Sequence, residues 1–264
     1  MWRRYNSTYD PSSNMPFRIS RSKIDLFIQC PRCFYLDKRL GISRPSMPGF
    51  SLNSAVDALL KKEFDLLRIK KEAHVLMKKY HIDAIPYTHR DLDIWRENFK
   101  GKEYHEPETN FIITGAIDDI WQNPKGELHI VDYKSTSTEK VISLNDKWKD
   151  AYKRQMEMYQ WIFRNSGFPI SETGYFVYAN ASKARAQFDG KLEFELSIIE
   201  YEGNDSWILP TLKRMKEVLN SDTVPSFTDT CEHCQFVLKS APKLKPLAQE
   251  IKVSKIRITE QLSF

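Results

Sequence analysis

The clearest pattern along the chain is a pair of apolar, β-branched runs on either side of a turn. Residues 115–121 and 127–134 flank the sequence Gln-Asn-Pro-Lys-Gly at 122–126, which predicts a β-hairpin. In the second strand, Asp132 and Lys134 are two residues apart and therefore share a face, while Tyr133 points to the other. With the turn centred near residues 124 and 125, Asp118 lies opposite Asp132 or within one residue of it.

Apolar spacing predicts helices before and after this hairpin. A short capped helix over 22–29 precedes a linker over 41–49 that contains Gly and Pro, and apolar residues at helical spacing predict a long helix from Leu52. A further helix over 146–164 has an apolar and aromatic face, and another helix is expected over 205–219. The residues on the face of the 146–164 helix are Trp148, Ala151, Tyr152, Tyr159 and Ile162.

Two later runs read as strands, and one long stretch shows no regular pattern. Residues 174–179 are apolar throughout, as in a buried strand, whereas 192–198 alternate, as in a half-exposed edge strand. Residues 83–110 are rich in Pro, aromatic and charged residues, which predicts irregular structure with short helical turns. The order helix, strand, strand, helix, strand predicts a mixed α/β fold.

Composition narrows the class of protein. With 264 residues, 41% hydrophobic residues and 9 Gly, the chain is typical of a globular protein. The net charge of +5 does not by itself establish nucleic-acid binding. The long apolar run of a membrane span, the apolar run of a secretory signal and the GxxxxGK[ST] phosphate loop of an ATP motor are not found. We therefore expect a cytoplasmic protein with a flexible arm (1–16), one domain (17–240) and a lysine-rich tail (241–264).

The predicted hairpin also contains the candidate catalytic residues. Asp118 and Asp132 would place two hard oxygen ligands beside the Lys134 ammonium, as a magnesium-dependent phosphodiesterase requires. An Asp and a Lys two apart on a strand are often only a surface ion pair. The carboxylate on the neighbouring strand, together with the helix that follows, favours a site.

At these residues the chain resembles the PD-(D/E)XK nuclease superfamily, and within it the RecB/AddB-type domain and the exonucleases of CRISPR adaptation. Three motifs carry most of the resemblance: Gly115-Ala-Ile-Asp118, Val131-Asp132-Tyr-Lys134, and the Gln-x-x-x-Tyr helix motif Gln155-Met-Glu-Met-Tyr159. The resemblance implies a restriction-endonuclease-like mixed sheet flanked by helices. It also implies Mg²⁺ or Mn²⁺ held by Asp118, Asp132 and the Tyr133 carbonyl, with Lys134, Gln155 and Tyr159 assisting catalysis. For Gln155 and Tyr159 taken alone, core packing is the simpler interpretation.

One position departs from the family pattern. A helix before the hairpin usually carries His or Glu in a G-x-x-V-H-like motif, and here Asp57 stands where His is expected. Aspartate can ligate Mg²⁺, so Asp57 is the preferred additional ligand. Glu63 is the competing candidate because it lies beside the apolar stripe of the same helix.

The four cysteines form two Cys-x-x-Cys pairs near opposite ends of the chain: Cys30, Cys33, Cys231 and Cys234. This spacing predicts a structural metal site that joins the N- and C-terminal segments. The segment from Cys30 is similar to the Cys-Pro-x-x-Phe-Tyr-Leu sequence of iron–sulfur nucleases of this family, which favours a [4Fe-4S] cluster. Those proteins use one N-terminal and three C-terminal cysteines, so structural Zn²⁺ is the alternative, and a redox dithiol or inert thiols are further possibilities.

The motifs and this resemblance predict a metal-dependent DNA nuclease. The resemblance implies an exonuclease that acts on single-stranded ends or flaps, and it connects the chain with DNA repair or CRISPR adaptation and with a helicase or integrase partner, which no residue identifies. Exposed aromatics such as Trp95, Tyr104 and Trp121 could stack bases, although packing is the commoner role of such residues. The main alternative is a catalytically inactive binding module or a subunit of a repair or CRISPR-adaptation complex, which the Asp57 departure keeps open. A third possibility is an iron–sulfur redox sensor.

Overall fold

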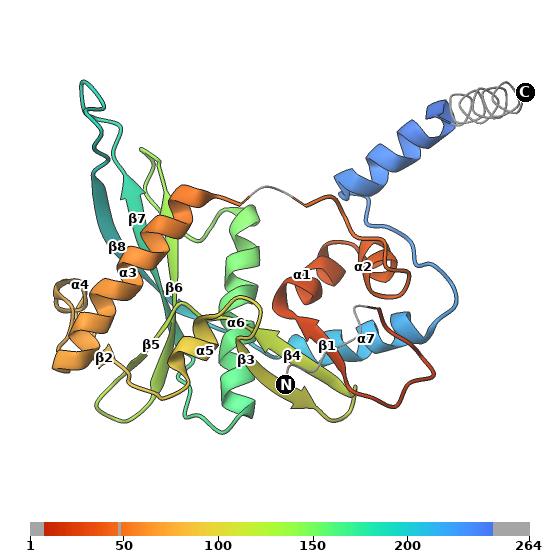
Figure 1. Cartoon of the computed structure of the whole chain (residues 1–264), viewed down its shortest axis with the longest axis horizontal. Coiled ribbons are helices and arrows are strands. Elements are labelled where there is room, and N and C mark those ends of the chain that lie inside the picture. The colour runs from red at the N-terminus through yellow and green to blue at the C-terminus, as the bar shows by residue number, and fades with distance from the viewer. Residues whose placement is uncertain (1–7, 47–48, 245–264) are drawn as a thin grey trace, which may run out of the picture. The chain divides into compact units, whose positions relative to one another are not determined.

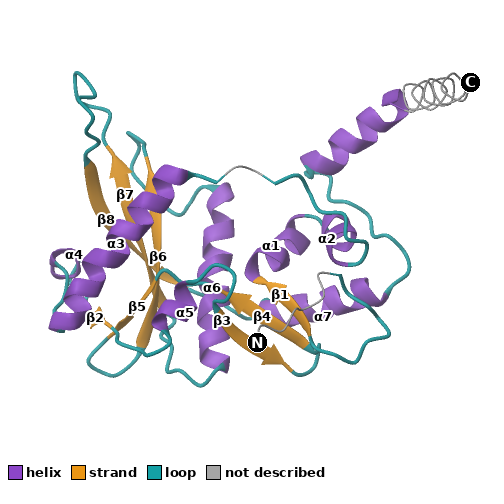
Figure 2. Ribbon diagram, in the orientation of Figure 1, coloured by secondary structure: helices purple, strands orange, loops and turns teal. Residues whose placement is uncertain are grey.

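The computed structural model describes residues 8–46 and 49–244 (Figures 1 and 2). The arm expected over 1–16 lies outside the described residues as far as residue 7, and the tail expected over 241–264 lies outside them from residue 245. No helix among the described residues is long and apolar enough to cross a membrane.

The helices and strands follow the expected order with several additions, and a last helical stretch covers 232–244. In chain order the elements are β1 (Phe17–Ser20), α1 (Arg21–Gln29), α2 (Pro31–Lys38), α3 (Ser51–Lys70), α4 (Val75–Lys79), β2 (Ile85–Pro86), α5 (Leu92–Arg96), β3 (Lys102–Glu106), β4 (Phe111–Gly115), β5 (Asp119–Gln122), β6 (Leu128–Thr136), the 3₁₀ turn η1 (Lys147–Lys149), α6 (Asp150–Asn165), β7 (Thr173–Ala181), β8 (Phe194–Glu202) and α7 (Ile208–Asn220).

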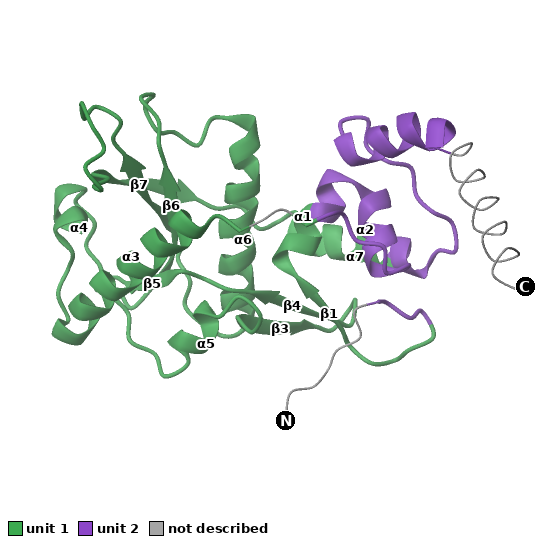
Figure 3. Cartoon of the chain, turned by 45° about the horizontal axis from the view of Figure 1, so that its top comes forward, with its two compact units in different colours: residues 1–6, 12–25, 46–216 green, residues 7–11, 26–45, 217–264 purple. Residues whose placement is uncertain are grey.

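The chain divides into two compact units (Figure 3). Of the described residues, unit 1 holds 12–25, 46 and 49–216, and unit 2 holds 8–11, 26–45 and 217–244. Unit 2 is therefore assembled from three separate segments of the chain. In one of them Tyr9 is buried, and its hydroxyl donates to Asn220 Oδ1 at 2.7 Å.

A five-stranded mixed sheet forms the centre of unit 1, in the order β2-β5-β6-β7-β8. The predicted hairpin is β5 and β6, whose antiparallel register pairs Asp119 with Val131. Strands β6 and β7 run parallel, and α6 lies in the connection between them. The apolar run is the buried inner strand β7 and the alternating run is the edge strand β8, as the two patterns predicted.

A second, three-stranded sheet of unit 1 has the order β1-β4-β3. Strand β3 corrects the expectation of irregular structure over 83–110, which also holds the short strand β2. The sequence of β3 is Lys-Glu-Tyr-His-Glu, and only its last residue is buried, so no apolar alternation marks it. It is a strand because it pairs with β4, which supplies the buried Phe111 and Ile113.

Different elements cover the two faces of the large sheet (Figure 1). On one face, α3 and α4 pack an apolar cluster that includes Phe64, Met77, Trp121 and Val131. Helix α6 covers the other face and also contacts the small sheet. A Cβ on Gly174 of β7 would lie 2.4 Å from Met156 Sδ, and one on Gly115 of β4 would lie 2.5 Å from Tyr159 Cε1. Glycine in the Gly115-to-Asp118 motif is thus required by the close approach of α6.

Together these features confirm the predicted fold class. The structure is mixed α/β, with mixed sheets flanked by helices, and the N- and C-terminal cysteine pairs lie together within unit 2.

Candidate active site and cysteine centre

Strand β6 places Asp132, its middle residue, and Lys134 on the face covered by α6. Asp132 is fully buried, and its Oδ2 forms an ion pair with the Lys134 ammonium. Gln155, from the first turns of α6, donates from Nε2 to Asp132 Oδ1 at 2.8 Å, and its Oε1 accepts from Lys134 Nζ at 3.4 Å. One glutamine side chain therefore holds both members of the pair.

Tyr159 lies one helical turn beyond Gln155 on the same face of α6. Gln155 Nε2 also lies 3.1 Å from the Tyr159 hydroxyl, and Tyr159 is buried against β4. The structure thus brings both residues of the Gln-x-x-x-Tyr motif to Asp132, with Tyr159 packed rather than free to reach a ligand.

Asp118 directly precedes β5, at the level of Asp132 on the neighbouring strand. Its Oδ2 accepts a hydrogen bond from the Tyr133 backbone N–H at 2.8 Å. Its Oδ1 lies 3.3 Å from the ammonium of Lys61, a residue of α3. The Lys61 Nζ is also 2.8 Å from Asp57 Oδ2. A lysine ammonium thus bridges Asp57 and Asp118.

The two candidates for the extra ligand go to different places. Asp57 joins Asp118 through Lys61, whereas the Glu63 carboxylate contacts His74 Nε2 at 2.8 Å and is about half exposed. Of the two, Asp57 is the residue that the structure brings to the predicted site.

The charges of the site alter the proton affinities of its members. Burial raises the pKa of Asp132 to about 6, against the opposing effect of Lys134. Burial, and then the negative charge of Asp118, raise the pKa of Asp57. Burial would lower the pKa of Lys134, but the charges of Asp132 and Asp118 raise it.

A buried ionic network, which the sequence did not reveal, supports the site from behind. Asp119 is fully buried, and its Oδ1 accepts from Arg68 Nη2 at 2.5 Å and from Arg96 Nη2 at 2.9 Å. The Tyr133 hydroxyl donates to Asp119 Oδ2 at 2.8 Å. Arg96 Nε also donates to the Asp118 carbonyl at 2.9 Å. The available signals were an arginine within the apolar stripe of a helix and two successive aspartates in the predicted hairpin, whose side chains point to opposite faces in extended backbone.

The aromatic residues considered for base stacking are packing residues, whereas one residue expected on an apolar helix face is exposed. Trp95 and Trp121 are buried; Trp121 stacks on Phe64 with 5.4 Å between ring centroids, and Tyr104 packs against Trp161 at 5.2 Å. These contacts confirm packing as their role. Trp148, expected on the inner face of a helix, is instead 63% exposed, because η1 precedes α6 and turns its side chain outward.

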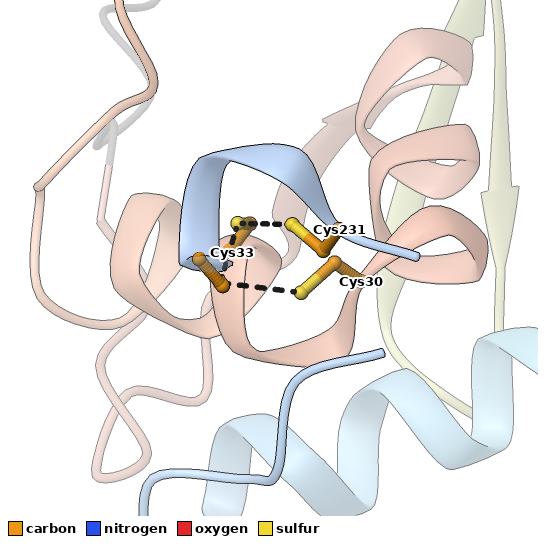
Figure 4. A group of neighbouring side chains, drawn as sticks. Cys30, Cys33 and Cys231 are labelled. Atoms are coloured by element: carbon orange, nitrogen blue, oxygen red, sulfur yellow. Dashed lines mark hydrogen bonds between the residues drawn. The ribbon is translucent and has the colours of Figure 1, made fainter. Parts of the chain in front are cut away.

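The four cysteines of unit 2 lie together, and Figure 4 labels three of them, Cys30, Cys33 and Cys231. All are buried, and their sulfur atoms lie within 4.8 Å of one another. Cys33 Sγ is 3.6 Å from Cys231 Sγ and 3.4 Å from Cys234 Sγ, and Cys30 Sγ is 3.7 Å from Cys234 Sγ. The expected convergence of the two pairs is confirmed, and the group is suited to hold a metal.

The pKa values of the clustered thiols move in opposite directions: burial raises those of Cys33 and Cys234, whereas that of Cys30 is lowered. Burial opposes ionisation of Cys30, but hydrogen bonds from the backbone at Cys33 and Thr228 lower its pKa to about 7. Arg44 Nη2 donates to Cys231 Sγ at 3.3 Å. A guanidinium in this position compensates negative charge on the sulfurs.

Among the described residues, the cysteine cluster is the one group of three or more potential ligands that already converge to metal-binding distance. Asp57, Asp118 and Asp132 do not form such a group. Their donor set is nevertheless suited to a hard cation, and two ammonium groups, from Lys61 and Lys134, contact their oxygens. These two ammonium groups offset most of the negative charge of the three carboxylates.

Comparison with known proteins identifies the class. A family model described as the PD-(D/E)XK nuclease superfamily matches residues 18–237, and the chain belongs to this superfamily, whose members are in general metal-dependent nucleases. No curated protein matches the chain. A solved structure titled "Crystal structure of SSO0001" is 19% identical, covers 79% of each chain and has a TM-score of 0.33.

Proposed function

We propose that the protein is a divalent-metal-dependent DNA nuclease that acts as an exonuclease on single-stranded ends or flaps. The observation that carries the proposal is the buried Asp132, paired with Lys134, held by Gln155 and adjacent to Asp118. Burying a carboxylate costs free energy even when it is paired with an ammonium group, and such perturbed charged clusters are concentrated at functional sites.

The metal would be Mg²⁺ or Mn²⁺, held by Asp118, Asp132 and the Tyr133 carbonyl, with Asp57 as a further ligand. When bound, such an ion polarises the phosphate and acidifies a water. Lys61 already bridges Asp57 and Asp118, which supports this pair as a cation site. The same contact means that the Lys61 ammonium must move aside for an ion to bind there.

Three side chains beside the carboxylates, those of Lys134, Gln155 and Tyr159, would assist the reaction. Lys134, held by Asp132 and Gln155, would orient or deprotonate the attacking water or stabilise negative charge on the phosphate. Gln155 fixes the positions of the Lys134 ammonium and the Asp132 carboxylate by a hydrogen bond to each. Tyr159 holds Gln155 in place.

The subfamily and pathway rest on the motifs alone. The Gln-x-x-x-Tyr helix and the cysteine pairs support a RecB/AddB-type nuclease similar to the exonucleases of CRISPR adaptation. A helicase or integrase partner, in repair or in CRISPR adaptation, would suit a chain in which no phosphate loop is found.

The test is a nuclease assay on end-labelled single- and double-stranded DNA with Mg²⁺, Mn²⁺ or EDTA. Wild type is compared with Lys134→Ala and with Lys125→Ala, which changes an exposed lysine in the turn of the same hairpin. Metal-dependent cleavage that is lost in Lys134→Ala and retained in Lys125→Ala supports the proposal. Equal cleavage by wild type and Lys134→Ala contradicts it.

The second candidate is a binding module without catalysis, and the feature that favours it is Asp57 in place of the family's His. Its signature in the same assay is DNA that wild type binds but leaves intact under every metal condition. Asp57→His would then be the first restoring substitution, and cleavage gained by that variant would identify a decayed site.

For the cysteine cluster we infer a single zinc ion rather than the [4Fe-4S] cluster that the Cys30 segment suggests. A zinc ion with Zn–S bonds of about 2.3 Å holds its four sulfurs about 3.8 Å apart. Three of the six sulfur–sulfur distances here are 3.4–3.7 Å, and all six are within 4.8 Å. A four-iron cluster places a larger body between its ligands and needs wider spacing. Metal analysis of anaerobically purified protein, with its visible absorption spectrum, decides: one zinc and no visible band supports the inference, and four irons with sulfide overturns it.

A further inference from the structure

One aromatic side chain near the candidate active site is exposed although most of its kind in this protein are not. Trp148 is 63% exposed, whereas Trp95, Trp121 and Trp161 are buried. Trp207 is partly buried, and its indole N–H donates to Glu157. Among the tryptophans that the structure describes, Trp148 alone therefore presents most of its ring to solvent.

The ring of Trp148 is nevertheless held in place. Its centroid lies 4.9 Å from the Lys149 ammonium, a cation–π distance. Lys149 is itself buried, and its Nζ donates to the Ser143 carbonyl at 2.6 Å and contacts Asp146 at 3.0 Å. A large ring that already contacts a buried cation has little conformational freedom left to lose, so binding a ligand on it costs less side-chain entropy.

Trp148 is also joined to the candidate catalytic lysine through one residue. The Trp148 and Tyr152 rings meet edge to face, with 5.5 Å between centroids, and the Lys134 ammonium lies 4.6 Å from the Tyr152 centroid. An aromatic surface therefore leads from solvent to the group expected to contact the phosphate.

The geometry points to Trp148 as a stacking site for an unpaired nucleobase, next to the nucleotide whose phosphate faces Lys134. This inference rests on the proposed function and adds how the strand is held. Bases stack on exposed aromatic rings regardless of sequence, and a strand with unpaired bases can offer one, whereas an intact duplex cannot. Trp148 would therefore select single-stranded ends.

The test is binding of a fluorescently labelled single-stranded oligothymidylate in EDTA, followed by anisotropy, with an oligonucleotide of equal length built from abasic sites. Trp148→Ala is expected to weaken binding of the normal strand about tenfold, or about 1.4 kcal/mol, and Trp148→Phe much less. Phe99→Ala, which removes another exposed aromatic ring of unit 1, is the matched control. Thermal unfolding checks that each variant is folded.

Base stacking also predicts non-additive losses. The abasic strand should bind wild type about as weakly as the normal strand binds Trp148→Ala, and the variant should not distinguish the two strands. The inference is overturned if Trp148→Ala binds the normal strand as well as wild type does, or if it loses equal affinity for both strands. The proposed function is tested separately, by cleavage that wild type shows and Lys134→Ala lacks. Failure of the stacking inference in the binding assay can therefore be distinguished from failure of the nuclease proposal in the cleavage assay.

Discussion

The carboxylate site of unit 1 and the cysteine cluster of unit 2 are both assembled from residues distant in the sequence, but their charges are balanced differently. The cysteine sulfurs face one another, with a single guanidinium, that of Arg44, at the edge. The carboxylates face two lysine ammonium groups, those of Lys61 and Lys134. The first arrangement suits permanent retention of a metal, and the second suits exchange among several cations and a phosphate.

The largest effect is expected for Cys33→Ser, because Cys33 contacts two other sulfurs of the cluster. Loss of one thiolate should abolish stoichiometric metal binding, since structural metal sites of this kind contribute about 10–16 kcal/mol in small peptides. Metal content after dialysis measures the effect. His233→Ala, at an exposed position between Cys231 and Cys234, should retain the metal; loss in this control would mean that the ligand set extends beyond cysteine.

Asp132→Asn should reduce cleavage by about 10³-fold, because a metal ligand worth several kcal/mol in the transition state is lost. The metal content of the cysteine cluster should be unchanged. Initial rates on labelled single-stranded DNA, with parallel metal analysis, test whether the two regions are independent. Near-normal rates would remove Asp132 from the active site.

Asp119→Asn should destabilise the protein by about 3–5 kcal/mol, because the Arg68 and Arg96 guanidinium groups would lose their buried counter-charge. Asp65→Asn is the control, since its side chain is 41% exposed and pairs with the same two arginines. Urea unfolding of metal-loaded protein measures both. Similar losses in the two variants would show that burial does not set the strength of this network.

Lys61→Gln should bind Mn²⁺ about tenfold more tightly, a change of about 1.4 kcal/mol, because no ammonium then competes for Asp57 and Asp118. Lys62→Gln, an exposed neighbour on α3, should bind Mn²⁺ as wild type does. Mn²⁺ titration followed by electron paramagnetic resonance gives the affinities. Unchanged affinity in Lys61→Gln would mean that the ion binds elsewhere.

Patterns that depend on neighbours in the sequence were sufficient for the hairpin, for β7 and β8 and for the convergence of the cysteines. Strand β3 was missed because Lys102–Glu106 has no apolar face, and its pairing with β4 decides its structure. Trp148 was placed on the wrong side because the periodicity was extended through η1, which is not α-helical.

The candidate site shows the same division. Asp118, Asp132, Lys134 and Gln155 occupy motif positions and could be named from the sequence. The roles of Lys61, Arg68 and Arg96 depend on where α3 and α5 pack against the sheet, which no local pattern encodes. The different surroundings of Asp57 and Glu63 likewise required the structure, because the two residues lie on one helix yet Asp57 pairs with Lys61 beside Asp118 and Glu63 contacts His74.

The construction of unit 2 from three chain segments sets an order of events during synthesis. Cys30 and Cys33 emerge about two hundred residues before Cys231, and contacts so distant in sequence form slowly. The residues that form unit 1 are nearly all synthesised before the second cysteine pair exists. A folding chain therefore holds two uncommitted thiols while its large sheet assembles, and the arrival of the last segment, not the start of the chain, determines when the metal is captured.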